Sequence, residues 1–430
     1  MIHPSEIPSL VYADSAGNII DFDEISMAGM AAGAYRLPEL SELIELPPGS
    51  ELFALPQRQP VGFDPHTHEP VLLANDPHRS TKKVQAVAAF MAPAHTAILS
   101  AAYHSTPDCV RLPLYAYTAV GWHDERFWVA AFRSDPDQRQ EPHHFKQRAI
   151  DTATFARLEA YRDNRLVQHL GTCCLSYQCP AARNFFLARY EAPLPCSPHC
   201  NARCLGCISK QPSQSCPATQ ERINFVPTAD ELAEVALLHI DTVKNPVVSF
   251  GQGCEGEPLL LARLMETAIG EIRRHTERGT INLNSNASLP DAVARLARAG
   301  LDSIRVSLNS AQPRYYERYY RPANYSLNDV IESIAIMKQA GRFVSLNYFI
   351  MPGFTDSHDE TTALFNLLEK TGVDLIQLRN LNIDPEFYLN ELRVPADLDG
   401  HGMSGWLRLL NKTFPAVRTG YFNPCLNPDT

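Results

Sequence analysis

The sequence has little that would suit a membrane or a nucleic-acid backbone. Its most apolar stretch, residues 84–103, is mostly alanine and is interrupted by Gln85, Pro93 and His95. A membrane-spanning helix needs about 20 mainly apolar residues. Lys and Arg number 38 against 48 Asp and Glu, which gives a net charge of -10. Because non-specific nucleic-acid binding depends on clustered cations, we expect neither a membrane nor a nucleic acid as a partner.

The N-terminus also lacks a secretory signal, because no basic segment followed by an apolar run is present. We therefore expect a cytoplasmic protein. Disulfides are scarce in that compartment. The 11 cysteines of the chain consequently favour metal binding or free thiols.

Four cysteines gather in the segment CSPHCNARCLGC, at Cys196, Cys200, Cys204 and Cys207. Their neighbours are loop-forming residues without a helical or strand period, which argues against simple packing. A four-thiolate zinc site usually shows two CxxC pairs, but only Cys204 and Cys207 form one here. An iron–sulfur cluster held on one compact loop fits this spacing better.

After this loop, short apolar runs alternate with helical periods, a pattern that predicts successive βα units. We expect six strands at residues 189–194, 247–250, 281–283, 303–308, 344–350 and 375–378. Right-handed crossovers wind such strands into a parallel barrel or partial barrel, with its chemistry at the carboxyl ends of the strands. The fold class is therefore α/β, with a partial parallel (β/α)6 core over residues 189–392.

The remaining parts of the chain lack this alternation of strands and helices. Residues 1–165 contain hairpin signals around residues 15–18 and 123–126 and many prolines, which indicates a mixed β-rich accessory domain. Residues 166–188 form a cysteine-containing connector, and residues 393–430 form a tail with one helix.

Polar residues follow the predicted strands at their carboxyl ends. Glycines and acidic residues occupy 251–257 after the second strand, and neutral amides and hydroxyls follow the later strands. Glycine permits close approach of a ligand, and neutral hydrogen-bonding groups suit a ligand such as a ribose. A plain tight turn explains the glycines equally well, and a loop cap explains any single strand-end polar residue better than a binding role does. The recurrence at strand after strand favours a binding site.

These motifs resemble the radical SAM superfamily. The loop Cys200-x3-Cys204-x2-Cys207 is similar to its cluster loop, Gly256-Glu257-Pro258 to its SAM-binding motif, and residues 348–353 to its fifth-strand segment. The resemblance implies that the three thiolates bind a [4Fe–4S] cluster whose open iron chelates S-adenosyl-L-methionine (SAM). The predicted SAM-binding residues are Gly253, Gly256, Glu257, Asn286, Ser307, Asn309, Asn347, Ile350, Gln377 and Arg379.

Two positions depart from the family pattern. Gly206 stands where the family commonly has an aromatic residue near the adenine, and Glu255 replaces the first glycine of the SAM-binding motif. The adenine contact must then come from elsewhere, for example from Leu205, Ile208 or Ile350.

The resemblance implies a radical reaction. The reduced cluster cleaves SAM to methionine and a 5′-deoxyadenosyl radical, which abstracts hydrogen from an unidentified peptide, protein or small-metabolite substrate. An electron donor such as a flavodoxin or ferredoxin is implied as a partner. Two alternatives are an RNA-modifying radical SAM methyltransferase, against which the net charge of -10 speaks, and a non-catalytic metal-binding interaction module.

Several roles stay open for the other cysteines. Cys254 lies inside the predicted SAM-binding turn, where it could act catalytically as a hydrogen donor, bind a second centre, or simply pack. An auxiliary iron–sulfur cluster or burial in the core are the alternatives for five more thiols: Cys173, Cys174, Cys179, Cys196 and Cys216. Adjacent residues face different ways on a helix, which disfavours a site that uses both Cys173 and Cys174.

Overall fold

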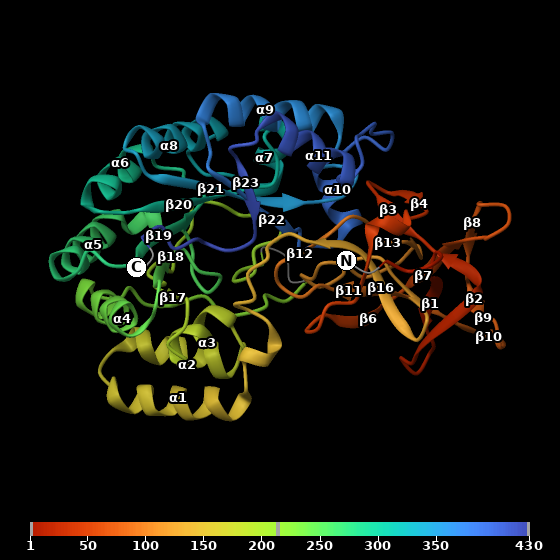
Figure 1. The fold of residues 1–430 in the computed structure, drawn as a ribbon, viewed down its shortest axis with the longest axis horizontal. Coiled ribbons are helices and arrows are strands. Elements are labelled where there is room, and N and C mark those ends of the chain that lie inside the picture. Colours follow the sequence, from red (N-terminus) through yellow and green to blue (C-terminus); the bar gives the residue numbers. More distant parts are fainter. Residues whose placement is uncertain (1–2, 212–215, 428–430) are drawn as a thin grey trace.

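The computed structural model describes residues 3–211 and 216–427. A parallel sheet with helices on its outer side forms one part of the molecule, and an antiparallel β-rich part lies beside it (Figure 1). Both are joined by three helices, α1 (Gln147–Ala160), α2 (Arg165–Leu175) and α3 (Pro180–Phe186). The expected combination of a parallel α/β core with a β-rich N-terminal region is confirmed.

Within the described ranges, seven strands pair in parallel and in sequence order, and six of them are the predicted ones. The seventh, β23, lies in the tail for which the sequence predicted one helix only. Their bounds are β17 (Glu191–Pro193), β18 (Val247–Phe250), β19 (Thr280–Ser285), β20 (Ser303–Leu308), β21 (Phe343–Ile350), β22 (Leu375–Asn380) and β23 (Arg418–Gly420).

The helices that follow these strands begin and end at recognisable caps. Thr228 and Glu231 form a capping box at the start of α4, and Gly300 and Gly372 end α6 and α9 in the left-handed conformation that glycine adopts without strain. The helix bounds are α4 (Ala229–Thr242), α5 (Ala262–His275), α6 (Pro290–Ala299), α7 (Pro313–Tyr320), α8 (Leu327–Gln339), α9 (His358–Thr371), α10 (Pro385–Leu392) and α11 (Met403–Thr413).

Strand β20 shows how the sheet separates its two faces. Ile304, Val306 and Leu308 are fully buried, whereas Arg305 and Ser307 between them are only partly buried. Because successive side chains of a strand point to opposite faces, apolar residues pack under the helices and polar ones face the concave interior. The sequence pattern thereby places polar chemistry inside the partial barrel.

The N-terminal part consists of antiparallel strands, and both predicted hairpins are confirmed: β1 pairs with β2 and β15 with β16. The strands are β1 (Ser9–Ala13), β2 (Ile19–Met27), β3 (Gly29–Ala31), β4 (Ala34–Arg36), β5 (Leu43–Glu45), β6 (Glu51–Leu55), β7 (Arg58–Phe63), β8 (Pro70–Leu72), β9 (Asn75–Asp76), β10 (Arg79–Lys83), β11 (Gln85–Phe90), β12 (His95–Ala97), β13 (Ser100–Ala101), β14 (Tyr103–Ser105), β15 (Val120–His123) and β16 (Arg126–Arg133). The domain boundaries predicted at residues 165, 188 and 392 stay a proposal.

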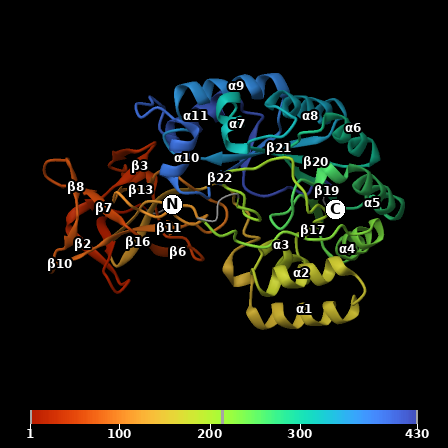
Figure 2. The ribbon, with the colours of Figure 1, turned by 180° about the vertical axis from the view of Figure 1, so that it is seen from behind.

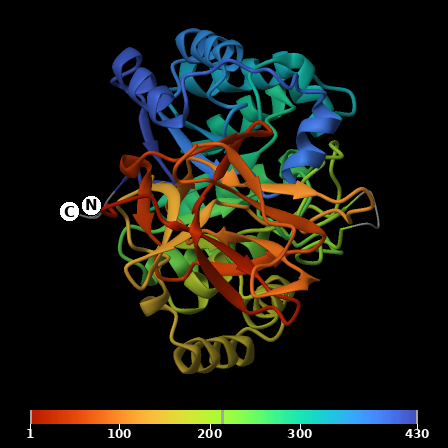
Figure 3. The ribbon, with the colours of Figure 1, turned by 90° about the vertical axis from the view of Figure 1, so that its right-hand side faces the viewer.

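Polar contacts dock the N-terminal part onto the carboxyl ends of the parallel strands. Arg58 and Asp384 form a buried ion pair with 2.9 Å between Nη2 and Oδ2. The side-chain amide of Asn380, at the end of β22, accepts from the Ala97 backbone N–H and donates to the His95 carbonyl. Figure 3 shows the N-terminal strands in front of the parallel sheet when the molecule is viewed from this side.

Helices α1 to α3 cover the edge of the sheet that β17 forms. There α2 packs against α4, and α3 packs against β17. Figure 2, the view from behind, also shows these three helices at the β17 edge of the sheet. Among the described residues, no helix combines the length and the apolar character that crossing a membrane requires.

Candidate functional site

The three cysteines of the predicted cluster loop lie around one cavity. Cys200, Cys204 and Cys207 line a space of about 270 Å³ that follows β17. Three cationic side chains share its wall: Arg203, Lys210 and Arg222. Three thiol ligands beside positive charge suit a metal cluster whose thiolates carry negative charge.

Burial raises the pKa of two of these thiols. It raises the pKa of Cys200 to about 11, and Glu257 adds to the effect. Burial also raises the pKa of Cys204, together with the neighbouring thiols of Cys207 and Cys200. The Arg222 guanidinium Nη2 lies 3.5 Å from the Cys207 sulfur. Cys200 and Cys204 therefore need a positive centre to become thiolates, and a bound metal supplies one.

The loop after β18 packs directly against the cluster loop. The N–H of Gly256 donates to the Ser197 carbonyl at 2.6 Å, and the N–H of Glu257 donates to the His199 carbonyl at 2.7 Å. A Cβ atom on Gly256 would come within 1.9 Å of the His199 carbonyl oxygen. Glycine is consequently required here by the close approach of two backbones.

Glu255 explains one departure from the family motif. Its buried carboxylate accepts from the N–H groups of Cys196 and Ser197 on one loop, and of Gly251 and Gln252 on the other. Burial raises the pKa of Glu255, although these four donors act in the opposite direction. The side chain thus connects the two loops, which a glycine could not do.

Glu257 faces into the fold at the end of β19. Its carboxylate accepts from the Ser285 hydroxyl at 2.6 Å and from the backbone N–H groups of Leu259 and Asn286. Burial raises the pKa of Glu257 to about 7. The Asn286 amide in turn donates to the side-chain oxygen of Asn201, so this predicted residue contacts the cluster loop itself.

A second cavity, of about 330 Å³, occupies the interior of the partial barrel. Gly206 and Ile208 bring the far side of the cluster loop to its wall, and Phe90, Met91 and Ala116 of the N-terminal part also line it. The strands and the segments that follow them contribute Arg305, Asn347, Phe349, Arg379, Asn380, Leu381, Asn382 and Tyr421, and Tyr319 comes from α7.

This interior cavity is cationic. Burial and the nearby Arg379 lower the pKa of Arg305 to about 9, while Arg379 stacks on the Tyr421 ring at 3.8 Å from its centre. The buried Nε atoms of Arg305 and Arg379 and the Oδ1 atom of Asn347 have no hydrogen-bond partner. No Asp or Glu lines the cavity among the described residues, so its polar groups suit an anionic ligand.

Tyr319 occupies the space beside Gly206. A Cβ on Gly206 would lie 2.8 Å from the Tyr319 hydroxyl oxygen, and the Tyr319 ring packs edge-on against Phe349 with 5.7 Å between centres. Aromatic surface is therefore present where the cluster loop lacks it. Of the predicted adenine contacts, Ile208 lines the interior cavity, whereas Leu205 and Ile350 are buried in the core.

The other predicted SAM-binding residues are more dispersed. Ser307 pairs in register with Asn347 on the interior face. Gln377 donates to the Asn423 side chain and accepts from Arg305, and Asn309 donates to the Tyr388 hydroxyl. A Cβ on Gly253 would meet Gln220 and Ile208 side chains. Only Asn347 and Arg379 of the predicted set line the interior cavity.

Sequence reasoning missed Arg305, Tyr319 and Tyr421 as residues of the interior cavity. A charged residue alternating with buried aliphatic ones in β20 was an available signal for Arg305. No local pattern marks Tyr319 or Tyr421, because their position depends on how α7 and the segment after β23 pack.

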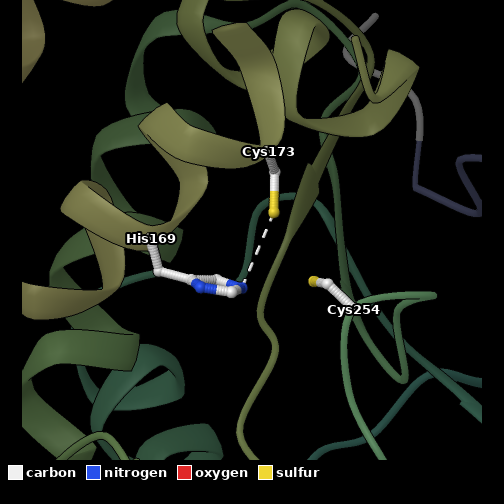
Figure 4. A group of neighbouring side chains, drawn as sticks. All are labelled: His169, Cys173 and Cys254. Carbon is white, nitrogen blue, oxygen red and sulfur yellow. Dashed lines mark hydrogen bonds between the residues drawn. The ribbon is translucent and has the colours of Figure 1, made fainter. Parts of the chain in front are cut away.

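Cys254 is not among the residues that line either cavity. Its sulfur lies instead beside Cys173 and His169 of α2 (Figure 4). Three other thiols lie elsewhere: Cys174 contacts the Thr154 hydroxyl, Cys196 lies against Glu255, and Cys216 lies near Arg111. Cys179 lies near Cys173 and Cys254. The expectation that Cys173 and Cys174 face different ways is confirmed.

The match to a family model agrees with this geometry. Residues 194–365 match the model of the radical SAM superfamily, a span that contains the cluster loop and strands β18 to β21. Over this segment the chain matches the radical SAM superfamily. Its members are enzymes that use a [4Fe–4S] cluster and SAM, and the three-thiol cavity fits that cluster.

Characterised relatives are distant. The chain is 28% identical over 187 residues to GTP 3′,8-cyclase 2 of Mycobacterium tuberculosis, covering 43% of this chain and 48% of the relative. It is 23% identical over 266 residues to GTP 3′,8-cyclase of Petrotoga mobilis, covering 54% and 79%. The chain thus spans about half the length of the first curated relatives it matches.

Solved structures also resemble it at a distance. A radical SAM methyltransferase from Sphaerobacter thermophilus aligns with 18% identity and a TM-score of 0.35, over 47% of this chain and 63% of that one. Methylornithine synthase aligns with 14% identity and a TM-score of 0.36, over 63% and 77%.

Proposed function

We propose that this chain cleaves SAM reductively and uses the 5′-deoxyadenosyl radical to abstract hydrogen from a small anionic metabolite. The observation that carries the first half is the placement of Cys200, Cys204 and Cys207 around one cavity. Three thiolates leave one iron of a cubane without a protein ligand. When bound there, the cluster supplies the electron that breaks the carbon–sulfur bond of SAM.

The loops around the cavity support SAM binding. Gly256 and Glu257 are hydrogen-bonded to the segment that precedes Cys200, and Asn286 is bonded to Asn201 within the cluster loop. We assign to these residues the positioning of the methionine part of SAM. Asn347 and Arg379 line the interior cavity, where the ribose and adenine would extend, and Ser307 is the strand partner of Asn347. Tyr319 and Phe349 form the aromatic wall of this cavity.

The cations of the cluster cavity support an acidic electron donor. Arg203, Lys210 and Arg222 line this cavity beside the thiols, and opposite charge accelerates the encounter of two proteins. A flavodoxin or ferredoxin is the kind of donor that this surface suits.

The interior cavity supports the choice of substrate class. Arg305 and Arg379 face a space without lining carboxylates among the described residues, and their buried Nε–H groups have no partner. A buried N–H group without a hydrogen-bond partner is costly, so a carboxylate or phosphate of the substrate would satisfy both. GTP, for which the relatives are named, is one molecule of this class. Phe90, Met91 and Ala116 of the N-terminal part also line this cavity. Because they limit its space, a small molecule is favoured over RNA.

The first test measures SAM cleavage. Anaerobically reconstituted protein, reduced with dithionite, should convert SAM to 5′-deoxyadenosine, while Cys204→Ala should not. Cys109→Ala, a change of a half-buried cysteine outside the site, is the matched control and should retain activity. Stoichiometric zinc in place of iron in the cluster cavity, with no cleavage by the wild type, would overturn the proposal.

The second test addresses the substrate class. Anionic metabolites, GTP included, and neutral analogues such as guanosine are compared for their stimulation of 5′-deoxyadenosine formation. For the stimulating anion, Arg305→Gln and Arg379→Gln should raise KM by roughly 10–100-fold, because each removes a charge-assisted hydrogen bond. Exposed Arg162→Gln is the control. Stimulation by a neutral molecule that is unaffected in both variants would contradict the anionic substrate.

A further inference from the structure

A second group of metal-binding side chains lies away from the cluster loop. His169 and Cys173 are one helical turn apart on α2, so they project from the same face, and the His169 Nε2 atom lies 3.6 Å from the Cys173 sulfur. Cys254, from the loop after β18, points toward them from the other side (Figure 4). The three donor atoms all lie within 4.8 Å of one another.

The spacing of these atoms matches the coordination of a single ion. With Zn–S bonds of about 2.3 Å and Zn–N bonds of about 2.05 Å, tetrahedral angles place N and S about 3.6 Å apart and two sulfurs about 3.8 Å apart. The His169–Cys173 separation of 3.6 Å already equals the first value. Thiolates that bind a cubane lie further apart, because each binds a different iron.

The group is largely withdrawn from solvent, with both thiols buried and His169 half-buried. The side chains of Cys173 and Cys254 are buried, with 1% and 4% of their surface exposed. His169 packs edge-on against Phe225 with 6.2 Å between ring centres, which fixes the orientation of the imidazole. Structural metal sites are typically closed in this way, and catalytic sites keep an open position.

We propose that His169, Cys173 and Cys254 bind one thiophilic divalent ion, zinc, in a site separate from the iron–sulfur cluster. Cys179 is the N-cap residue of α3, its backbone N–H donates to the Cys173 carbonyl, and its thiol acts electrostatically on Cys254, so it is the protein candidate for the fourth ligand. A water molecule is the alternative fourth ligand.

Such an ion would connect α2 to the loop that supports the cluster. Cys254 lies next to Glu255, whose carboxylate joins this loop to Cys196 and Ser197. The Cys254 carbonyl also accepts from the Ile223 N–H at 2.7 Å. The metal would therefore hold in place the segment on which the cluster loop rests.

The test is carried out on full-length protein in which Cys200, Cys204 and Cys207 are replaced by alanine, so that the cluster cannot contribute. This background should bind one zinc per chain. Cobalt(II) should replace the zinc and give thiolate charge-transfer and tetrahedral absorption bands. Cys173→Ser, Cys254→Ser and His169→Gln should each weaken cobalt binding at least tenfold, and Cys174→Ser, on the adjacent helical position, should not.

A measurement without substitution of these ligands guards against misfolding. Chelation of zinc from the triple-alanine background should lower its melting temperature, and added zinc should restore it. Zinc or cobalt binding that survives Cys254→Ser, iron and sulfide retained by the background, or a Cys173–Cys254 disulfide in folded metal-free protein would each overturn the site. None of these readouts depends on SAM cleavage, so the two proposals can fail independently.

Discussion

The two cysteine sites of this chain differ in how open they are. Cys200, Cys204 and Cys207 line a cavity of about 270 Å³ among cationic side chains, whereas Cys173 of α2 and Cys254 are buried. An open position is what a catalytic metal needs, and a closed set of ligands is what a structural one needs. The same residue type thus serves two purposes, and its surroundings distinguish them.

One loop connects these two sites. Residues 251–257 carry Cys254 on the closed side and Gly256, which is hydrogen-bonded to Ser197, on the open side. Perturbation of one site should therefore reach the other only through this loop. The following predictions use that expectation, in order of decreasing effect.

Removal of one cluster-loop thiol should abolish the activity of the cluster site and leave the zinc site occupied. Cys200→Ala or Cys207→Ala should abolish SAM cleavage, because the cluster loses a thiolate ligand, while the zinc content of the chain stays at one. Metal analysis of the same samples checks both statements. Loss of zinc together with iron would show that the two sites are not independent.

Gly256→Ala should disturb metal binding at both sites. The new Cβ would lie 1.9 Å from the His199 carbonyl oxygen, so the loop must shift, at a cost of roughly 3 kcal/mol or more in the free energy of unfolding. Both iron and zinc loading should fall.

Gly270→Ala is the matched control for this change. Gly270 lies within α5 and its added Cβ would meet nothing within 4 Å. Alanine there should stabilise the protein by about 0.5–1 kcal/mol. Chemical denaturation compares the two variants; equal stability would contradict the close packing of the loops.

Glu257 should make the free energy of unfolding depend on pH. The unfolded chain releases the Glu257 proton at its ordinary pKa of 4.5, whereas burial holds the folded pKa at about 7. The folded state then binds more protons between these values, so its free energy of unfolding falls as pH rises through this window, by roughly 3 kcal/mol. Above the folded pKa the contribution is constant.

Denaturation of metal-free protein at several pH values measures this effect. Glu257→Gln does not titrate and should lack this part of the slope, while a change of the exposed Glu69 to Gln should retain it. An unaltered slope in Glu257→Gln would exclude the raised pKa.

Cys174→Ala should have the smallest effect. Its sulfur contacts the Thr154 hydroxyl, on the other side of α2 from the closed site, and its loss should cost about 1–2 kcal/mol of stability through lost packing. Zinc binding and SAM cleavage should persist. A loss of zinc here would indicate that α2 presents the other cysteine to the metal.

The sequence predicted the local features well and the long-range ones poorly. Six parallel strands followed from apolar runs, and the cluster loop followed from the spacing of Cys200, Cys204 and Cys207. The strand β23 was missed because a three-residue edge strand carries almost no periodicity.

Long-range packing also explains what sequence analysis missed in the sites. His169 and Cys254 meet only because α2 packs beside the loop after β18. Similarly, Phe90 and Met91 reach the interior cavity through the docking of the N-terminal strands. Neither contact has a local signature, because the partners are far apart in the chain.

The most direct test of the account is the electron paramagnetic resonance spectrum of the reconstituted, dithionite-reduced protein with and without SAM. An open-sited cluster should give a reduced [4Fe–4S] signal that changes on addition of SAM, since SAM binds the iron without a protein ligand. The signal should be absent in Cys204→Ala and present in Cys173→Ser. A spectrum that SAM leaves unchanged, or a signal that survives in Cys204→Ala, would contradict the assignment.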